Sequence, residues 1–340
     1  MKLEVRDLVT AYGIWYLNVI DSRKEELLNY VKSIISDEQI MLLSLNGDAS
    51  FRRYFRVSGK NLIAVDAPPS TQKNKEFISI DKALEAVSVK VPKIIAYDLD
   101  KGFMLLEDLG DTTFAKVAIG AQQQSYYEKA VDLLPKIATV DVDCPLFDRE
   151  FINFELSLFD TWMLDKKLKV TLSDEEKETL KKNYSYLADN CLSQEQVAVH
   201  RDYHSRNLMK SKDELAVIDF QDMVKGPITY DLASIIYDCY INLDKDLISH
   251  LIQRAFNNYR NSGFLSETSL EEFKAKLKLT SLQRHVKVLG IFCRLSLRDG
   301  KDNYLNDLPR VICYVLEESK DDPKLQSFRA IIEKYVVGKF

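Results

Sequence analysis

The sequence of 340 residues lacks the features that mark disulfide-stabilised, zinc-binding and membrane-spanning proteins. Its five cysteines are widely scattered, and they form no Cys-x-x-Cys pair or other metal-ligand spacing. We therefore expect reduced thiols, as is usual in cytosolic proteins. No window of about 18 uncharged apolar residues appears, and the first residues carry acids instead of a long apolar stretch. The sequence thus predicts a cytoplasmic protein with no membrane partner.

An excess of basic residues is also absent. The formal net charge is −5 and the isoelectric point is about 5.6, so the overall field does not favour a nucleic-acid partner. A small nucleotide is compatible with this charge, because local groups and a metal would bind it. With 46% hydrophobic residues, the chain is long enough to bury a sizeable core in two lobes, and we expect a monomer.

No internal repeat, low-complexity tract or long Pro/Gly linker divides the chain. Up to residue 109, the apolar spacing predicts an amphipathic helix capped by Ser22, followed by short strands between turns. The expected helices span residues 22–36 and 74–88, and the expected strands span residues 39–45, 51–57, 61–67, 93–97 and 102–107. This pattern is typical of a small β-rich lobe built on an antiparallel meander.

Beyond Gly110 the sequence becomes mainly helical. Helices are expected at residues 124–138 and 173–188, the second with a capping box at its start, and one strand pair joins residues 208–210 to 215–220. We therefore predict an α+β fold of two lobes connected by a hinge. The smaller, β-rich lobe spans residues 1–109, the larger, helical lobe spans residues 110–340, and the hinge lies near residues 107–110.

The most informative segment is His200-Arg201-Asp202-Tyr203-His204-Ser205-Arg206-Asn207, which is followed by an acid, Asp219, inside an apolar run. Asp202 and Asn207 lie five positions apart on a predicted loop, and Asp219 ends the next hairpin strand. Such a set supplies one carboxylate for an acceptor hydroxyl and two oxygen ligands for Mg²⁺. It predicts the phosphotransfer centre of a kinase, with Asp202 as the catalytic base and Asn207 and Asp219 as metal ligands. The alternative is that Asp202 and Asn207 only cap turns in a surface loop.

Four stretches of the chain resemble the aminoglycoside phosphotransferase and choline kinase-like superfamily: residues 47–57, 65–69, 200–209 with 218–222, and 290–301. Eukaryotic protein kinases differ, because here Asp219-Phe220 is followed by Gln221 instead of Gly and no Ala-Pro-Glu segment follows. Within the superfamily, the four stretches are most similar to the bacterial anomeric N-acetylmuramate/N-acetylglucosamine kinases of cell-wall recycling. The resemblance implies a bilobal, protein-kinase-like fold that uses ATP and Mg²⁺.

The resemblance also implies a nucleotide site in the first lobe. A turn at Gly47, Asp48 and Ser50 would cover the triphosphate with backbone N–H groups. Glu107 and Leu109 would meet adenine through main-chain groups at the hinge. The alternative for the turn at residues 47–50 is a plain hairpin. The alternative for the hinge segment is an ordinary connector.

The third predicted strand, residues 61–67, lacks the Lys that kinases use to pair with phosphates. Arg53 is the proposed substitute, because period-two alternation places it on the apolar face of its strand, where a charge needs a partner. Lys60 is the alternative. Arg52 and Arg56 would then face solvent.

The resemblance places the sugar site in the helical lobe. Glu155 and Trp162 either belong to a helix core or hold the sugar, through a hydroxyl acceptor and an apolar ring face. His204 would lie near the substrate or support the catalytic loop. The lactyl carboxylate of an N-acetylmuramate substrate would favour a basic partner, for which the candidates are Arg206, Arg294 and Arg298.

These observations predict an ATP-dependent sugar kinase that converts N-acetylmuramate and N-acetylglucosamine to their 1-phosphates during peptidoglycan recycling. One alternative is an aminoglycoside or small-alcohol (choline-like) kinase. It would need a cluster of acids to receive a polycation, and Asp222, Glu155 and Asp160 do not exclude it. The missing third-strand Lys also allows a nucleotide-binding pseudokinase, although a scaffold would not require Asp202, Asn207 and Asp219 together.

Overall fold

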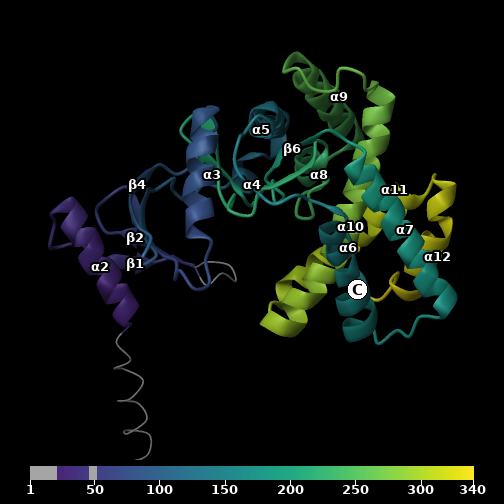
Figure 1. The fold of residues 1–340 in the computed structure, drawn as a ribbon, viewed down its shortest axis with the longest axis horizontal. Coiled ribbons are helices and arrows are strands. Elements are labelled where there is room, and N and C mark those ends of the chain that lie inside the picture. The colour runs from purple at the N-terminus through teal and green to yellow at the C-terminus, as the bar shows by residue number, and fades with distance from the viewer. Residues whose placement is uncertain (1–20, 46–51) are drawn as a thin grey trace, which may run out of the picture. The chain divides into compact units, whose positions relative to one another are not determined.

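The structure is a computed structural model that describes residues 21–45 and 52–340 (Figure 1). Contacts divide the chain into two compact units. Unit 1 comprises the chain up to Lys75 together with Lys93–Asp108, and unit 2 comprises Glu76–Pro92 together with Leu109–Phe340.

Unit 1 is built on a five-stranded antiparallel sheet with the strand order β1-β2-β3-β5-β4. The strands are β1 (Leu42–Ser44), β2 (Arg53–Val57), β3 (Leu62–Asp66), β4 (Ile94–Asp98) and β5 (Phe103–Glu107). The sheet confirms the predicted β-rich start of an α+β fold. Each strand lies within or next to a predicted apolar run, because alternating apolar residues and intervening turns specify short strands.

Helix α2 (Ser22–Ile35) packs on one face of this sheet. Leu27 and Val31 join a buried cluster with residues from β2, β3 and β5. The cap of this helix is Asp21 and not Ser22, because the Asp21 carboxylate accepts a hydrogen bond from the Lys24 N–H at 3.1 Å. The prediction of a Ser22 cap was wrong by one residue.

Unit 2 is mainly helical. Its longer helices are α5 (Gln123–Ala138), α6 (Arg149–Leu158), α7 (Asp174–Leu192), α9 (Lys245–Asn261), α10 (Leu270–Asp299), α11 (Leu308–Ser319) and α12 (Gln326–Tyr335), with shorter α4 (Phe114–Val117) and α8 (Tyr230–Ile236). The predicted capping box at the start of α7 is confirmed. A π-helix, η2 (Phe159–Lys167), continues directly from α6.

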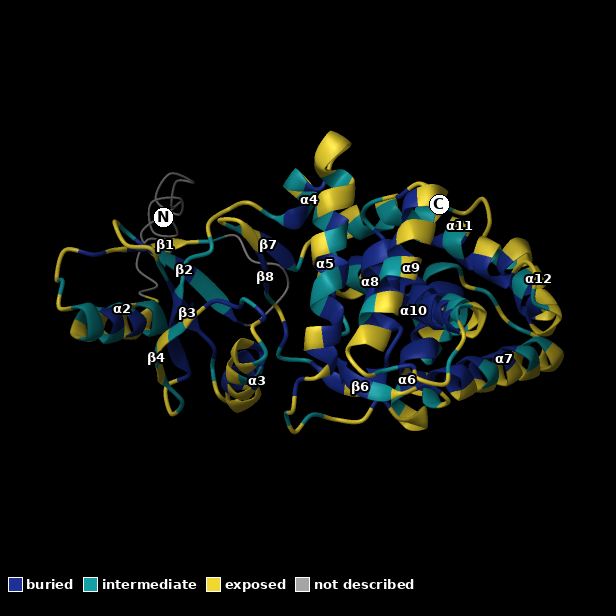
Figure 2. Cartoon of the chain, turned by 90° about the horizontal axis from the view of Figure 1, so that it is seen from above, coloured by how far each residue is buried: buried dark blue, intermediate teal, exposed yellow. Residues whose placement is uncertain are grey.

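Helix α10 runs through the core of unit 2. Figure 2 colours its middle and the whole of α8 dark blue, as buried residues. A Cβ added at Gly290 would lie 2.2 Å from the carbonyl carbon of Leu158. Glycine therefore lets the backbones of α10 and α6 touch at this point.

Two short strand pairs carry the loops of unit 2. The pair β7 (Leu208–Ser211) with β8 (Glu214–Val217) confirms the predicted hairpin. The second pair, β6 (Gln196–Val199) with β9 (Val224–Pro227), was not predicted. Its partners are separated by the catalytic segment, so no local hairpin pattern marks them.

Helix α3 (Asn74–Ala86) begins in unit 1 and continues in unit 2. Its Phe77 ring stacks on Phe220 with centroids 4.8 Å apart, and the Lys90 carbonyl accepts from the Val217 N–H at 2.8 Å. Residues 76–92 therefore group with the helical unit, whereas the sequence analysis assigned all of residues 1–109 to the smaller lobe. Among the described residues, no helix combines the length and apolar character needed to cross a membrane.

Candidate active site

The predicted catalytic segment forms the loop between β6 and β7, and Asp231 holds its first half. The Asp231 carboxylate, in the first turn of α8, accepts hydrogen bonds from the N–H groups of His200 at 2.7 Å and Arg201 at 3.1 Å. Arg201 has a left-handed φ of 74°, a conformation that costs energy for a residue with a side chain. Burial raises the pKa of Asp231, while His200 and the two N–H donors oppose that rise. Asp231 thus fixes the turn immediately before Asp202.

A second carboxylate, Asp238, holds the other half of the loop. It accepts from the N–H of Ser205 at 2.9 Å and from the N–H of Tyr240 at 2.8 Å. The Tyr203 hydroxyl donates to the carbonyl of Ala130 in α5 at 2.9 Å. The loop is therefore anchored on both sides of the residues that would carry the chemistry. The sequence analysis did not identify Asp238.

The structure brings the three predicted catalytic and metal-binding residues together. The Asn207 side-chain amide donates to the Asp202 carbonyl at 3.0 Å, and its nitrogen lies 3.4 Å from Asp219 Oδ2. Asp219 has a left-handed φ of 66°, and Gln221 donates to its other carboxylate oxygen at 2.8 Å. A strained residue held in this way is common where a side chain must be aimed at a ligand.

Asn207 and Asp219 form a donor set that suits Mg²⁺. Both offer hard oxygens, and Asp219 is exposed. In the described part of the chain, no three His, Cys, Asp or Glu residues form a metal cluster. An ion held by Asn207 and Asp219 would therefore take its other ligands from phosphate oxygens and water, as Mg²⁺ commonly does.

Asp202 is kept ionised by surrounding basic side chains. Burial raises the pKa of this carboxyl, but Lys287, His204, Arg201 and His200 outweigh burial and hold the pKa at about 2. An ionised Asp202 can accept a hydrogen bond from an acceptor hydroxyl at neutral pH. Its low basicity favours taking the proton late, as the new bond to phosphorus forms.

Glu155, Arg201 and Lys287 form a buried charge network next to Asp202. Glu155 is 2% exposed and accepts from Arg201 at 2.6 Å and from Gln283 at 3.1 Å. Lys287 Nζ donates to the Tyr230 hydroxyl at 2.8 Å and lies 3.5 Å from Glu155. The structure thus gives Glu155, a predicted sugar ligand, three internal partners. Arg201, Lys287 and Gln283 carried no sequence signal, because they meet Glu155 only in the folded chain.

The comparisons with known proteins identify the type of enzyme. Residues 42–265 match the phosphotransferase enzyme family. This chain belongs to the phosphotransferase enzyme family. The predicted α+β, protein-kinase-like fold and the kinase activity are therefore confirmed at the level of the family.

Curated relatives of this phosphotransferase carry one shared name. It is similar to the "N-acetylmuramate/N-acetylglucosamine kinase" of Pseudomonas putida, with 35% identity over 87% of this chain and 89% of the relative. The Pseudomonas aeruginosa protein of the same name is 37% identical, with the same coverage. The one from Neisseria meningitidis is 32% identical over 92% of this chain and 96% of the relative. The predicted resemblance to these kinases is confirmed.

Solved structures agree on the fold of this phosphotransferase. An ADP-bound aminoglycoside phosphotransferase is 16% identical and gives a TM-score of 0.58, over 86% of this chain and 98% of that structure. A choline/ethanolamine kinase family protein from Mesorhizobium loti is 12% identical and gives 0.61, over 92% and 99%. At such low identity these structures support the fold alone.

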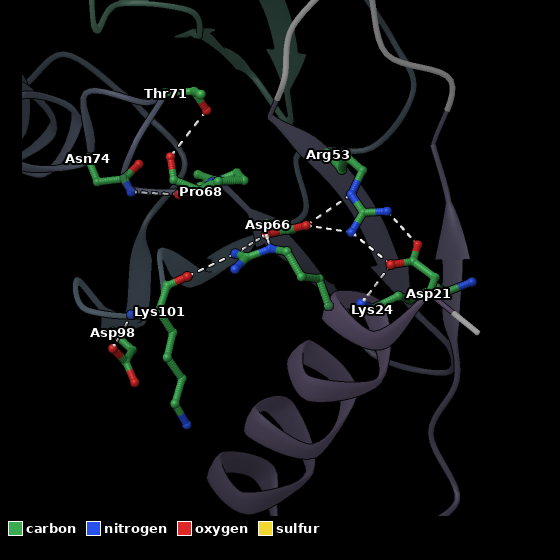
Figure 3. A network of polar contacts seen from close by, with 11 residues as sticks. Asp21, Lys24, Arg53, Asp66, Pro68, Thr71, Asn74, Asp98 and Lys101 are labelled. Atoms are coloured by element: carbon green, nitrogen blue, oxygen red, sulfur yellow. Dashed lines mark hydrogen bonds and ion pairs between the residues drawn. The ribbon is translucent and has the colours of Figure 1, made fainter. Parts of the chain in front are cut away.

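In unit 1 of the phosphotransferase, Arg53 is bound by two carboxylates (Figure 3). It donates to Asp66 at 2.9 and 2.6 Å and also to Asp21. Arg53 and Asp66 lie opposite each other in adjacent strands, on the face that α2 covers. The alternative cation, Lys60, pairs with Asp37 at 2.8 Å.

The arginines on either side of Arg53 do not face solvent, contrary to our expectation. Arg52 is 4% exposed, and Arg56 pairs with Asp108 at 2.5 Å. The alternation was correct, but on the second face Arg52 is buried and Arg56, with 28% of its side chain exposed, is paired instead of fully solvated. Sequence alternation separates two faces without showing how far each one is buried.

Of the other predicted nucleotide ligands, Glu107 belongs to unit 1 and Leu109 to unit 2. The Glu107 N–H donates to the Lys93 carbonyl at 2.9 Å, and the Glu107 carboxylate accepts from the Lys93 N–H at 3.3 Å. The predicted triphosphate turn, which contains Gly47, Asp48 and Ser50, lies outside the described residues. The roles of these residues stay predictions.

Most of the remaining candidates for substrate binding lie in unit 2 with partners of their own. The Trp162 ring is half-buried in η2, and Lys166 Nζ lies 3.8 Å from its centroid. The His204 ring meets Tyr240 edge-on at 5.3 Å, and burial lowers its pKa. The carbonyl of Asp222 accepts from Arg201 at 3.4 Å.

Proposed function

We propose that this phosphotransferase transfers the γ-phosphoryl group of Mg·ATP to the anomeric hydroxyl of N-acetylmuramate and of N-acetylglucosamine. The observation that carries the proposal is the assembled set of Asp202, Asn207 and Asp219 in a chain that shares 32–37% identity with three kinases of that name. The products are the sugar 1-phosphate and ADP. The role is that of a salvage kinase in peptidoglycan recycling.

Asp202 carries the proton transfer in this proposal. Its carboxylate accepts a hydrogen bond from the acceptor hydroxyl and aligns the hydroxyl oxygen with the γ-phosphorus. As the oxygen–phosphorus bond forms, the bond from phosphorus to the ADP oxygen breaks and the hydroxyl proton passes to Asp202. Release of that proton to solvent returns Asp202 to its ionised form.

Asn207 and Asp219 hold Mg²⁺ in this proposal. The ion offsets the negative charge of the phosphate oxygens when it is bound. Gln221 positions the Asp219 carboxylate through its hydrogen bond. Asp231 and Asp238 hold the loop, so the three residues keep their spacing without substrate-driven rearrangement.

The pairing of Glu155 disfavours its use as a carboxylate partner for a polycationic acceptor. Glu155, which was available for an aminoglycoside amine, is neutralised by Arg201 and Lys287. A polycationic drug would need uncompensated carboxylates. The aminoglycoside and choline-like alternatives are therefore less well supported than the sugar.

Release of ADP from Mg·ATP tests the proposal when it is measured with five acceptors: N-acetylmuramate, N-acetylglucosamine, glucose, kanamycin and choline. We expect turnover with the two N-acetyl sugars and none above background with kanamycin or choline. Turnover with only kanamycin or choline would overturn the proposed substrate and keep the kinase activity. Nucleotide binding without ADP release for any acceptor would favour a pseudokinase.

A further inference from the structure

Helix α10 presents a row of cations on one face, starting close to the catalytic carboxylate. Lys287, Arg294 and Arg298 are separated by seven and four residues, and these spacings return to the same side of an α-helix. Seven residues correspond to a rise of about 10 Å along the helix. The row therefore reaches from the core of unit 2 to the exposed end of α10.

Lys287 places the inner end of this row in the buried network that adjoins the catalytic loop. It contacts Glu155 and Tyr230, and Glu155 binds Arg201, the residue before Asp202. The charge of Lys287 is the largest favourable influence on ionised Asp202. The outer positions of the row thus lie farther along the helix that carries this buried cation.

Within residues 21–45 and 52–340, Arg294 is the member of this row that forms no ion pair. Its Nε is buried and meets no hydrogen-bond acceptor in the described parts of the chain. Burial and the neighbouring Arg298 lower its pKa. A buried guanidinium nitrogen without an acceptor is costly and is commonly explained by a water molecule or a ligand.

The other two candidate arginines, Arg298 and Arg206, each contact an aspartate. Arg298 donates to Asp299 at 2.7 and 2.9 Å. Arg206 lies 3.5 Å from the Tyr240 ring centroid and 3.9 Å from Asp307. Among the three arginines named as possible carboxylate partners, Arg294 is therefore the one that makes no direct ion pair with a described residue, and Asp299 acts on it without a hydrogen bond.

We propose that Arg294 binds the lactyl carboxylate of N-acetylmuramate and so sets the preference of the enzyme for the acidic sugar over N-acetylglucosamine. This inference rests on the proposed function. N-Acetylglucosamine lacks the lactyl group and leaves Arg294 without its partner. A guanidinium fits a carboxylate through two parallel N–H donors, which an ammonium cannot present.

The test compares kcat/KM for the two sugars in wild type and in Arg294→Gln. We expect kcat/KM for N-acetylmuramate to fall about 10- to 100-fold, in the range for loss of a charge-assisted hydrogen bond. Turnover of N-acetylglucosamine and the KM for ATP should change much less. An equal loss with both sugars, or no loss with either, would overturn the proposal.

A change in the substrate provides a second measurement that does not depend on the folding of a variant. The methyl ester of N-acetylmuramate keeps the shape of the lactyl group and removes its charge. Wild type should turn over the ester about as poorly as Arg294→Gln turns over the acid, and the two losses should not add. Wild type that treats ester and acid alike would contradict a role for any cation at this position.

Two further variants separate the possible explanations. Lys274→Gln, at the exposed start of the same helix, removes a cation paired with Glu271 and should leave both sugars unaffected. Arg298→Gln should have a smaller effect on N-acetylmuramate than Arg294→Gln, and the reverse order would assign the carboxylate to Arg298. Wild type that phosphorylates neither sugar would instead refute the proposed function, an outcome distinct from loss of discrimination.

Discussion

Arg201 Nη2 lies 2.6 Å from Glu155 Oε1, and the residue that follows Arg201 is the proposed base, Asp202. The contact joins the catalytic loop to helix α6. Both side chains are largely buried, with 17% of Arg201 and 3% of Glu155 exposed. The position of Asp202 therefore depends on an ion pair that includes no substrate.

Replacement of Glu155 tests this dependence. Glu155→Gln would leave Arg201 and Lys287 as buried cations without their anion, and loss of one partner of a buried pair costs about 3–5 kcal/mol. We expect a lower midpoint in urea unfolding together with a reduced kcat. Asp174→Asn, which breaks an exposed pair with Lys177, should change stability by at most about 1 kcal/mol. Comparable effects from both variants would show that the buried network has no special role.

Removal of the Asp202 carboxylate should abolish proton acceptance without unfolding the protein. Asp202→Asn keeps the size of the side chain, so we expect ATP binding to persist and kcat to fall by about 10²–10⁴-fold, as is typical for loss of a general base. Single-turnover kinetics with isothermal titration of ATP would measure both quantities. A kcat near that of wild type would mean that another group takes the proton.

Arg53 should matter for stability more than for nucleotide binding. Its guanidinium is occupied by Asp66 and Asp21, and Asp66 is 1% exposed. We expect Arg53→Gln to lower the thermal midpoint while the KM for ATP stays within a factor of about three. A KM for ATP that rises tenfold or more at unchanged stability would restore Arg53 as the phosphate-binding cation.

A buried histidine makes the stability of unit 2 depend on pH. His285 Nδ1 lies 2.9 Å from Glu318 Oε2. Burial opposes protonation, but the Glu318 carboxylate, together with Cys239, outweighs it and raises the pKa of His285 to about 10. Because the folded-state pKa lies above the ordinary value of 6.5, the protonated pair stabilises the fold fully below about pH 6.5 and loses this contribution as the pH rises toward 10.

We therefore expect the free energy of unfolding of the wild type to decline between about pH 7 and 10. Glu318→Gln should be less stable at pH 7 and should show a flatter profile over the same interval. Urea unfolding at several pH values measures both curves. Parallel curves would indicate that His285 is neutral in the folded protein.

Much of the catalytic centre could be predicted because its residues are close in sequence. Asp202, Asn207 and Asp219 lie on one loop and the hairpin after it, and their spacing reflects the chemistry of Mg²⁺ and a hydroxyl acceptor. The antiparallel sheet and the helical second part were also predictable, since apolar periodicity specifies each element.

The environment of these residues could not be predicted in the same way. Glu155 lies 46 residues from Arg201 and 132 residues from Lys287 along the chain. The packing of α6 against α10 brings Lys287 to Glu155, and the catalytic loop brings Arg201 to it. For Arg53, alternation gave the correct face but not the helix α2 that covers it. Local patterns do not encode such distant partners.

The measurement that tests the central claim most directly is phosphorus NMR of the product formed from N-acetylmuramate and Mg·ATP. The proposed function predicts a phosphomonoester whose phosphorus couples to the anomeric proton of the sugar, together with one equivalent of ADP. Phosphorus coupled to the protons at C6 would support the sugar kinase activity but contradict the anomeric hydroxyl as the acceptor. ADP release with no sugar phosphate would contradict the assignment of this sugar as the acceptor.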